Sequence, residues 1–249
     1  MLTPGLVSVS FRSLSFEEII RIAKEAGLKG IEWGSDVHAP YTDTKRLDAI
    51  REAGEKAGIA CCSYGTYFRL GVTPMEELGG YIAAAKRLGT DILRLWCGDK
   101  STALYTEEEK AALFAACQEA AQIAEKENVI FCMECHPNTF TEELCGALEL
   151  METVASPNFR MYWQPNQHRT EEEKNEYAKK IAPYTMHLHV YNWCKTDAFP
   201  LREGIAKWKR YLENFTGDRM LLLEFMPHHL PEELNAEADA LREIIGETK

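Results

Sequence analysis

The sequence lacks the features by which a chain engages a membrane or a nucleic acid. No apolar run approaches the ~20 residues that cross a bilayer as a helix. The opening residues, MLTPGLVSVSFRS, lack the basic start and long apolar core of a signal peptide. Basic charge is also scarce, with 28 Lys and Arg against 39 Asp and Glu, a net charge of −11. Because this charge repels polyanions and anionic lipids, we expect neither a nucleic-acid nor a membrane partner. The lack of signal-peptide features leads us to expect a cytoplasmic protein.

A repeated cysteine pair is missing as well, although the chain has eight cysteines. Cys132 and Cys135 form the single C-x-x-C spacing. If they lie on a strand, odd spacing sends their side chains to opposite faces, so they cannot bind one metal ion. With no export signal, we expect reduced thiols rather than disulfides.

What the sequence does have is a regular alternation of short apolar runs and longer segments with helical periodicity. The runs are rich in Val, Ile, Leu and Cys and do not alternate cleanly with polar residues, which is typical of strands buried on both faces of a parallel sheet. There are eight such runs, at residues 5–10, 29–33, 58–64, 91–96, 129–134, 159–164, 185–191 and 219–225.

The segments between the runs carry helix start and stop signals. Ser15 with Glu18 forms a capping box, and Gly27 ends the same segment. The predicted helices cover residues 15–27, 42–58, 73–89, 106–128, 141–154, 170–181, 202–215 and 231–245. Eight strand-then-helix units predict a single (β/α)8 TIM barrel over residues 1–249. A doubly wound open sheet is less suitable, because SVSFRSLSFEE has no G-x-G-x-x-G phosphate turn.

In such a barrel the active site lies at the carboxyl ends of the strands, and these ends are rich in polar and aromatic residues. Strand parity places Glu134 and His136 on one face, and His187 and His189 on one face. The candidates are Arg12, Glu32, Trp33, Tyr64, Tyr67, Arg94, Trp96, Glu134, His136, Gln164, Asn166, Gln167, His187, His189, Asn192, Lys195 and Glu224. Two carboxylates, an amide and an imidazole from the last four strands can converge on one divalent cation.

Structural roles compete with this interpretation. A Glu at a strand end is often simply solvated, but Glu224 lies between MLLL and FMP, where an unpaired charge would be costly. For His187, the deeper histidine, we favour a buried side chain bonded to backbone. Trp33, Tyr64 and Tyr67 can instead be packed residues of the barrel rim.

The chain resembles the xylose-isomerase-like TIM-barrel superfamily, the sugar isomerases and epimerases related to endonuclease IV. The resemblance covers the whole chain and rests on GIEW, RLWCG, MECHPN, HLHVYN and LLLEF in that order. It implies a metal set of Glu134, Gln164, His189 and Glu224 that binds Mn²⁺, Mg²⁺ or Zn²⁺. The superfamily usually has Asp where Gln164 stands and often Asp where Asn192 stands, so one negative charge is missing from the metal set.

The resemblance implies a metal-dependent isomerase or epimerase acting on a small sugar, polyol or sugar phosphate. Glu134 and Glu224 would move a proton α to a carbonyl through an enediolate. The expected substrate-binding residues are His136, Glu32, Arg94, Trp96, Asn192 and Lys195, with Trp33 and Trp163 as further apolar walls.

Two alternatives stay open. One is a dehydratase of the inosose-dehydratase kind, in which the same proton removal is followed by loss of a β-hydroxyl. The other is a sugar-binding barrel without turnover, which the amide of Gln164 makes credible. A DNA repair role is excluded by the acidic charge and by the lack of ligands for three zinc ions. The sequence leaves open whether the chain forms a homo-oligomer.

Overall fold

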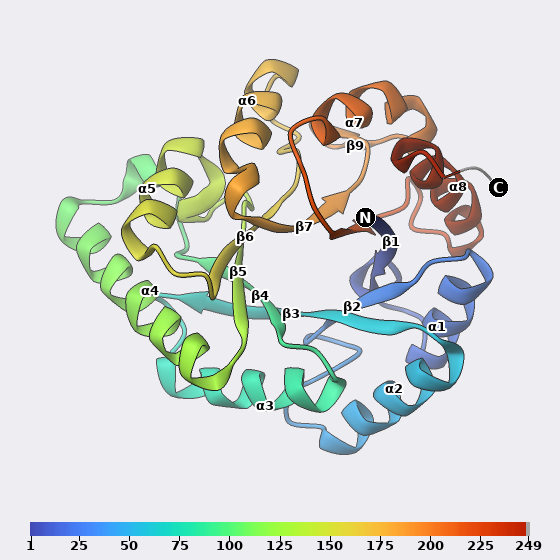
Figure 1. The fold of residues 1–249 in the computed structure, drawn as a ribbon, viewed down its shortest axis with the longest axis horizontal. Helices are drawn as coiled ribbons and strands as arrows, with labels where there is room; N and C mark the ends of the chain where they lie inside the picture. Colours follow the sequence, from blue (N-terminus) through green and yellow to red (C-terminus); the bar gives the residue numbers. More distant parts are fainter. Residues whose placement is uncertain (248–249) are drawn as a thin grey trace.

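The computed structural model describes residues 1–247, which fold as a closed barrel of eight parallel strands surrounded by eight helices (Figure 1). The barrel order is β1, β2, β3, β4, β5, β6, β7, β10, closing on β1. The strands are β1 (Leu2–Val7), β2 (Gly30–Gly34), β3 (Ala60–Leu70), β4 (Ile92–Cys97), β5 (Ile130–Glu134), β6 (Phe159–Trp163), β7 (Thr185–Val190) and β10 (Arg219–Leu223). The predicted (β/α)8 barrel is confirmed. Residues 248–249 of the predicted domain lie outside the described residues.

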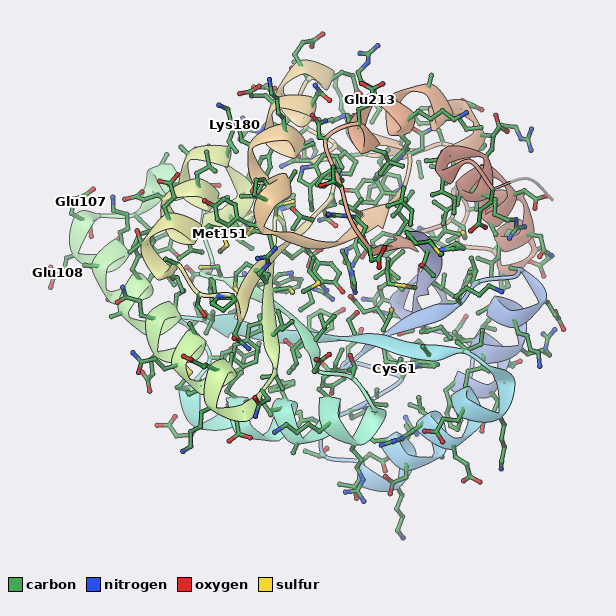
Figure 2. The ribbon with its side chains drawn as sticks, in the orientation of Figure 1. Cys61, Glu107, Glu108, Met151, Lys180 and Glu213 are labelled. Atoms are coloured by element: carbon green, nitrogen blue, oxygen red, sulfur yellow. The ribbon has the colours of Figure 1, made fainter. Side chains whose placement is uncertain are left out.

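The helices follow the strands in turn and cover the outside of the barrel (Figure 1). They are α1 (Phe16–Glu25), α2 (Thr44–Ala57), α3 (Leu78–Leu88), α4 (Glu107–Glu127), α5 (Leu144–Val154), α6 (Glu171–Ile181), α7 (Ile205–Leu212) and α8 (Leu234–Ile245). The capping box of Ser15 and Glu18 is present at the start of α1. Figure 2 shows Glu107 and Glu108 pointing outward from the first turn of α4, where acidic side chains complement the helix dipole.

One strand boundary differs from the prediction in a way that moves a candidate residue. Strand β3 continues to Leu70, well past the predicted end at residue 64, because Arg69 and Leu70 pair with Trp96 and Cys97 of β4. Tyr64 therefore lies within the barrel wall, fully buried, and its hydroxyl donates to the Ala39 carbonyl at 2.6 Å.

A small antiparallel hairpin after β7 was not predicted. It consists of β8 (Trp193–Cys194) and β9 (Asp197–Ala198), and Lys195 lies in its turn with a φ of 55°. Two-residue strands are too short to give a periodic signal in the sequence.

The two cysteines of the C-x-x-C spacing lie in different parts of the protein, one in the barrel interior and one in the outer core. Cys132 packs in a cluster with Val7, Tyr162 and Leu222, whereas Cys135 belongs to the larger core beneath the helices. This agrees with the expectation from strand parity. The same outer core contains Trp33 and Trp163, so neither is the cavity wall that we expected.

Among residues 1–247, no helix is both long and apolar enough to cross a membrane.

One buried carboxylate outside the barrel makes the stability of the fold depend on pH. Glu237 on α8 is 6% exposed, and both of its oxygens accept from the Leu201 backbone N–H, at 3.0 and 3.2 Å. Burial raises the pKa of Glu237 to about 7, and nearby Glu233 adds to this rise. Because the folded state holds this proton more tightly than the unfolded chain, its contribution is fully present below the unfolded pKa near 4.5 and is lost as the pH rises through about 7.

We therefore expect Glu237→Gln to gain stability over the wild type as the pH rises from 4.5 to 8, by up to about 3 kcal/mol. Urea unfolding at pH 5 and pH 8 measures the difference. Glu243→Gln, an exposed position on the same helix, is the control and should show no such change. An equal difference between Glu237→Gln and wild type at both pH values would contradict the assignment.

Candidate metal and active site

Three side chains from neighbouring strand ends surround the Nδ1 atom of His189. Gln164 Oε1 lies 3.1 Å from this nitrogen, and Glu134 Oε1 and Glu224 Oε2 each lie 3.4 Å from it. Glu134, His189 and Glu224 offer ligand atoms that all lie within 4.8 Å of one another. The structure thus brings together the four residues that the sequence predicted as a metal set.

The parallel register explains this convergence. Glu134 is the last residue of β5, Gln164 and Glu224 directly follow β6 and β10, and His189 is near the end of β7. Glu224 is further fixed by its successor, since Phe225 has a φ of 57° and its backbone N–H donates to Ser10 Oγ at 3.0 Å. A non-glycine residue held at positive φ is a strained position of the kind found at functional sites.

Arg94 on β4 connects two of the buried carboxylates. Its Nε donates to Glu32 Oε1 at 2.8 Å, its Nη1 donates to Glu134 Oε2, and the side chain is 3% exposed. Trp96 Nε1 also donates to Glu134 Oε2, at 2.5 Å. Burial alone would raise the pKa of Glu134, but Arg94 and His189 hold it well below its usual value.

Glu32 lies beneath the site rather than on its surface. It is fully buried, accepts from Ser63 Oγ at 2.8 Å, and its Oε1 lies 3.4 Å from His189 Nε2. Burial opposes ionisation, yet Arg94 and His189 lower the pKa of Glu32 to about 2. Our expectation that Glu32 binds substrate hydroxyls is therefore corrected: its carboxylate instead faces Arg94 and the second nitrogen of His189.

The charges of this cluster match a divalent cation. Glu32, Glu134 and Glu224 contribute three negative charges and Arg94 one positive charge. Burial would lower the pKa of His189, but Glu224 and Glu32 raise it well above the usual value. Three carboxylates and one guanidinium leave two excess negative charges. A proton on His189 Nδ1 can form a hydrogen bond with one or two of the three oxygens around it, and it offsets one of these two charges. A divalent cation offsets both, and carboxylate, imidazole and amide oxygen suit Mn²⁺, Mg²⁺ or Zn²⁺.

The second nitrogen of His189 agrees with this interpretation. Nε2 is enclosed and makes no hydrogen bond within residues 1–247, with Glu32 Oε1 at 3.4 Å as its carboxylate neighbour. A histidine that binds metal through one ring nitrogen normally donates its other N–H to a carboxylate or carbonyl, which fixes the tautomer. The residues present fit a bound metal ion.

A cavity of about 320 Å³ opens above these four side chains. Trp96, His136 and Arg94, three of the expected substrate-binding residues, line it. The His136 and Trp96 rings lie 4.9 Å apart. The complete lining is Val9, Arg12, Tyr67, Arg94, Trp96, Glu134, His136, Pro137, Gln164, Gln167, His168, Tyr191, Trp193, Glu224 and Phe225.

Besides Glu32, two further predicted substrate-binding residues, Asn192 and Lys195, do not line this cavity. Asn192 Nδ2 donates to the Pro200 carbonyl at 2.9 Å, which holds the loop after β7. Lys195 is exposed in the turn of the hairpin, and its backbone N–H donates to the Gln167 carbonyl at 3.0 Å. His187 is buried in the barrel with Nδ1 accepting from the Met220 N–H at 3.2 Å, and burial lowers its pKa to about 4. The preference for a structural His187 agrees with this placement.

The aromatic part of the cavity wall was missed. Trp193 and Phe225 line the cavity with their ring centroids 5.3 Å apart. Phe225 directly follows Glu224 and was detectable as the next residue of a site strand. Trp193 belongs to the hairpin, whose two-residue strands are too short to be detected in the sequence.

A model of the xylose isomerase-like TIM barrel family matches residues 20–244, so the chain belongs to this family. It is 23% identical to a 3-dehydroshikimate dehydratase of Bacillus anthracis over 275 residues, which cover 95% of both chains.

Solved structures agree in fold. The probable 3-DHS dehydratase AsbF of Bacillus anthracis matches with a TM-score of 0.79 and 20% identity, over 97% of this chain and 98% of that one. The IOLI protein with a bound zinc atom matches with a TM-score of 0.77 and 15% identity over 98% of each chain. D-Psicose 3-epimerase with D-tagatose, from Clostridium cellulolyticum, matches with a TM-score of 0.70 and 12% identity over 99% of this chain and 100% of that one.

The position of Arg94 generates a stability prediction. We expect Arg94→Met to lower the free energy of unfolding by about 3–5 kcal/mol at pH 7 in EDTA, because it leaves buried carboxylates without their cation. Urea unfolding measures this loss. Arg69→Met is the matched control, since Arg69 lies 4.3 Å from the Trp96 ring centroid but forms no ion pair with these carboxylates. Equal losses in the two variants would contradict the role given to Arg94.

Proposed function

We propose that the protein is a metal-dependent enzyme that removes a proton α to the carbonyl of a small hydroxylated compound, with Glu224 as the base. The observation that carries this proposal is that Glu134 and Glu224, the two carboxylates that line the cavity, have different hydrogen-bond and ion-pair partners. Glu134 Oε2 receives hydrogen bonds from both Arg94 and Trp96, whereas the Glu224 carboxylate has no ion pair within residues 1–247 other than that with His189 Nδ1. Strong donors that stabilise the ionised form make Glu134 a weak base.

Glu134, Gln164, His189 and Glu224 would hold the divalent ion. When bound, it would stabilise the negative charge that develops on the substrate oxygens as the proton leaves. The Glu224 carboxylate takes the proton, and the electron pair of the broken C–H bond forms the enolate. Returning the proton to the neighbouring carbon, while the hydroxyl proton passes from one oxygen to the other, gives aldose–ketose isomerisation. Returning it to the opposite face of the same carbon gives epimerisation.

His136 and Trp96 would orient the substrate. His136 Nδ1 lies 2.7 Å from the Pro137 carbonyl, which leaves Nε2 of the neutral ring as an acceptor for a substrate hydroxyl. The Trp96 indole offers a flat apolar surface to the C–H face of a sugar.

The substrate we propose carries no phosphate. Arg12 Nε donates to Asp36 Oδ2 at 2.7 Å and Arg12 Nη2 donates to the Tyr67 hydroxyl at 2.7 Å. Arg94 is held by Glu32 and Glu134. Both arginines that line the cavity are therefore already paired with carboxylates, and a phosphate would have to displace one of these partners.

Dehydration is the second candidate function. With Glu224 as the single base, the proton that it removes can be passed to a β-hydroxyl, which leaves as water while the enolate collapses to a C=C double bond conjugated with the carbonyl. The unequal carboxylates favour this single-base route over epimerisation, which needs a base on each face. The Bacillus anthracis relative at 23% identity is a dehydratase by name.

The test combines metal analysis with isotope exchange. The purified protein, loaded with Mn²⁺, is incubated in D₂O with D-tagatose, an inosose and 3-dehydroshikimate, and followed by NMR and ultraviolet absorbance. Deuterium at the α-carbon with a new aldose or epimer supports isomerisation. A conjugated product supports dehydration. A protein that binds no metal and exchanges no proton would contradict both candidates and favour a sugar-binding barrel.

For the base, we expect Glu224→Gln to slow α-proton exchange by about 10²–10⁴-fold, the usual effect of losing a general base. The conservative change keeps the side-chain volume, so circular dichroism and the unfolding midpoint should stay close to wild type. His168→Gln is the control, since His168 lines the same cavity without contacting the four site residues. Exchange that survives in Glu224→Gln but fails in His168→Gln would move the base to His168.

A further inference from the structure

Gln164 is the uncharged member of the four-residue set, and its amide offers two different groups. Oε1 lies 3.1 Å from His189 Nδ1, at the point where the carboxylate oxygens of Glu134 and Glu224 also meet. Nε2 has no hydrogen-bond partner within residues 1–247 and is not among the enclosed polar atoms, so it is open to solvent. Gln164 also lines the catalytic cavity.

From this placement we infer that Gln164 is a residue with two roles: Oε1 is a neutral metal ligand, and Nε2 donates to an anionic oxygen of the bound substrate. The inference rests on the proposed function and adds the substrate chemistry of that site. A ligand at this position that carried a charge, such as Asp, would have no hydrogen to donate.

The charge balance is the first step of the argument. Three carboxylates and one guanidinium leave two negative charges, which a divalent ion offsets completely. With a carboxylate in place of Gln164 the loaded site would keep one net negative charge. An oxyanion that forms in the cavity would then be repelled, and this repulsion is strong in a buried site where the effective dielectric constant is low.

The buried position of Gln164 is the second step. The side chain is 6% exposed, and its backbone N–H donates to Cys135 Sγ at 3.2 Å, while the Cys135 thiol lies 3.4 Å from the Gln164 carbonyl. These two contacts tie the residue after β6 to the residue after β5. The backbone of Gln164 is thus fixed beside Glu134, which limits the positions that its side-chain amide can reach.

The chemistry that follows is selective for an oxyanion on the reacting carbons, as in an enediolate. A neutral loaded site with an added N–H donor stabilises such an anion more than it stabilises the uncharged ketone, which is the condition for lowering the barrier.

The experiment uses two isosteric variants with opposite effects on the metal. Gln164→Glu keeps an oxygen ligand, adds a negative charge and removes the N–H donor. Gln164→Met removes both the oxygen ligand and the N–H donor and adds no charge. Mn²⁺ binding is measured by calorimetry without substrate. We expect Gln164→Glu to bind Mn²⁺ about tenfold more tightly than wild type, because affinity at such sites follows ligand charge, and Gln164→Met to bind it more weakly.

The donor role is read with acetohydroxamate, a planar anionic chelator that resembles an enediolate, bound to the Mn²⁺-saturated proteins. We expect its affinity to fall by about tenfold or more in Gln164→Glu, through added repulsion and the lost donor, and by a smaller factor in Gln164→Met, which loses the donor but adds no charge. Gln167→Glu, which adds the same charge at the cavity edge, is the matched control and should change both affinities less.

The outcomes separate the two parts of the inference. Equal Mn²⁺ affinity in the wild type and both variants would show that Gln164 is no ligand. Unchanged acetohydroxamate affinity in both variants would remove the donor role. A wild type that binds no Mn²⁺ overturns this inference and the proposed function together. The expected binding pattern in a protein that exchanges no α-proton would instead leave the inference in place and contradict the proposed function alone.

Discussion

The ion pairs of Arg94 are the interaction on which the candidate site depends. Its guanidinium contacts Glu32 and Glu134, which come from strands on either side of β4 and β3, in a region that solvent does not reach. Buried carboxylates at this density would otherwise take up protons or push the strand ends apart. The backbone has adapted to the pair: a Cβ at Gly65 would lie 2.7 Å from Glu32 Oε1 and 2.8 Å from Arg94 Nη2. Glycine on β3 therefore makes room for the ion pair inside the barrel.

The same pairing gives the carboxylates different chemistry. Glu32 is bound by Arg94 and Ser63 and faces the inner nitrogen of His189, so it can orient that ring but cannot reach a substrate. Glu134 is held on one oxygen, with its other oxygen directed to His189. Glu224 is the least constrained of the three. Three glutamates on three strands thus differ through their partners, and in the proposed mechanism they serve as an orienting group, a ligand and a base.

The fold followed from the sequence because its signals repeat. Each strand is a short apolar run and each helix has a cap or a periodic face, so errors at single boundaries did not change the eight-unit pattern. The four converging side chains were predictable for the same reason, since the carboxyl ends of parallel strands meet at one edge. The failures have local causes. Glu32 and Glu134 look alike in sequence, and only the reach of Arg94 separates the buried carboxylate from the one at the cavity. The position of Lys195 was predicted wrongly because the β8–β9 hairpin places it in an exposed turn. The position of Trp163 was predicted wrongly because this residue, which directly precedes Gln164, faces the helices rather than the cavity.

The charge of the cluster also links the site to the stability of the barrel. Two excess negative charges lie among side chains that are 0–6% exposed, in a protein whose net charge is already −11. Without a cation, a proton on His189 relieves part of this repulsion. The ring then lies protonated among three oxygens, in a form that cannot ligate a metal through Nδ1. A proton and a divalent ion therefore compete for the same nitrogen, and binding of the ion must release that proton. Glu134, His189 and Glu224 meet where the ends of β5, β7 and β10 come together. A divalent ion bound there would therefore lower the repulsion between these strand ends as well as activate the substrate.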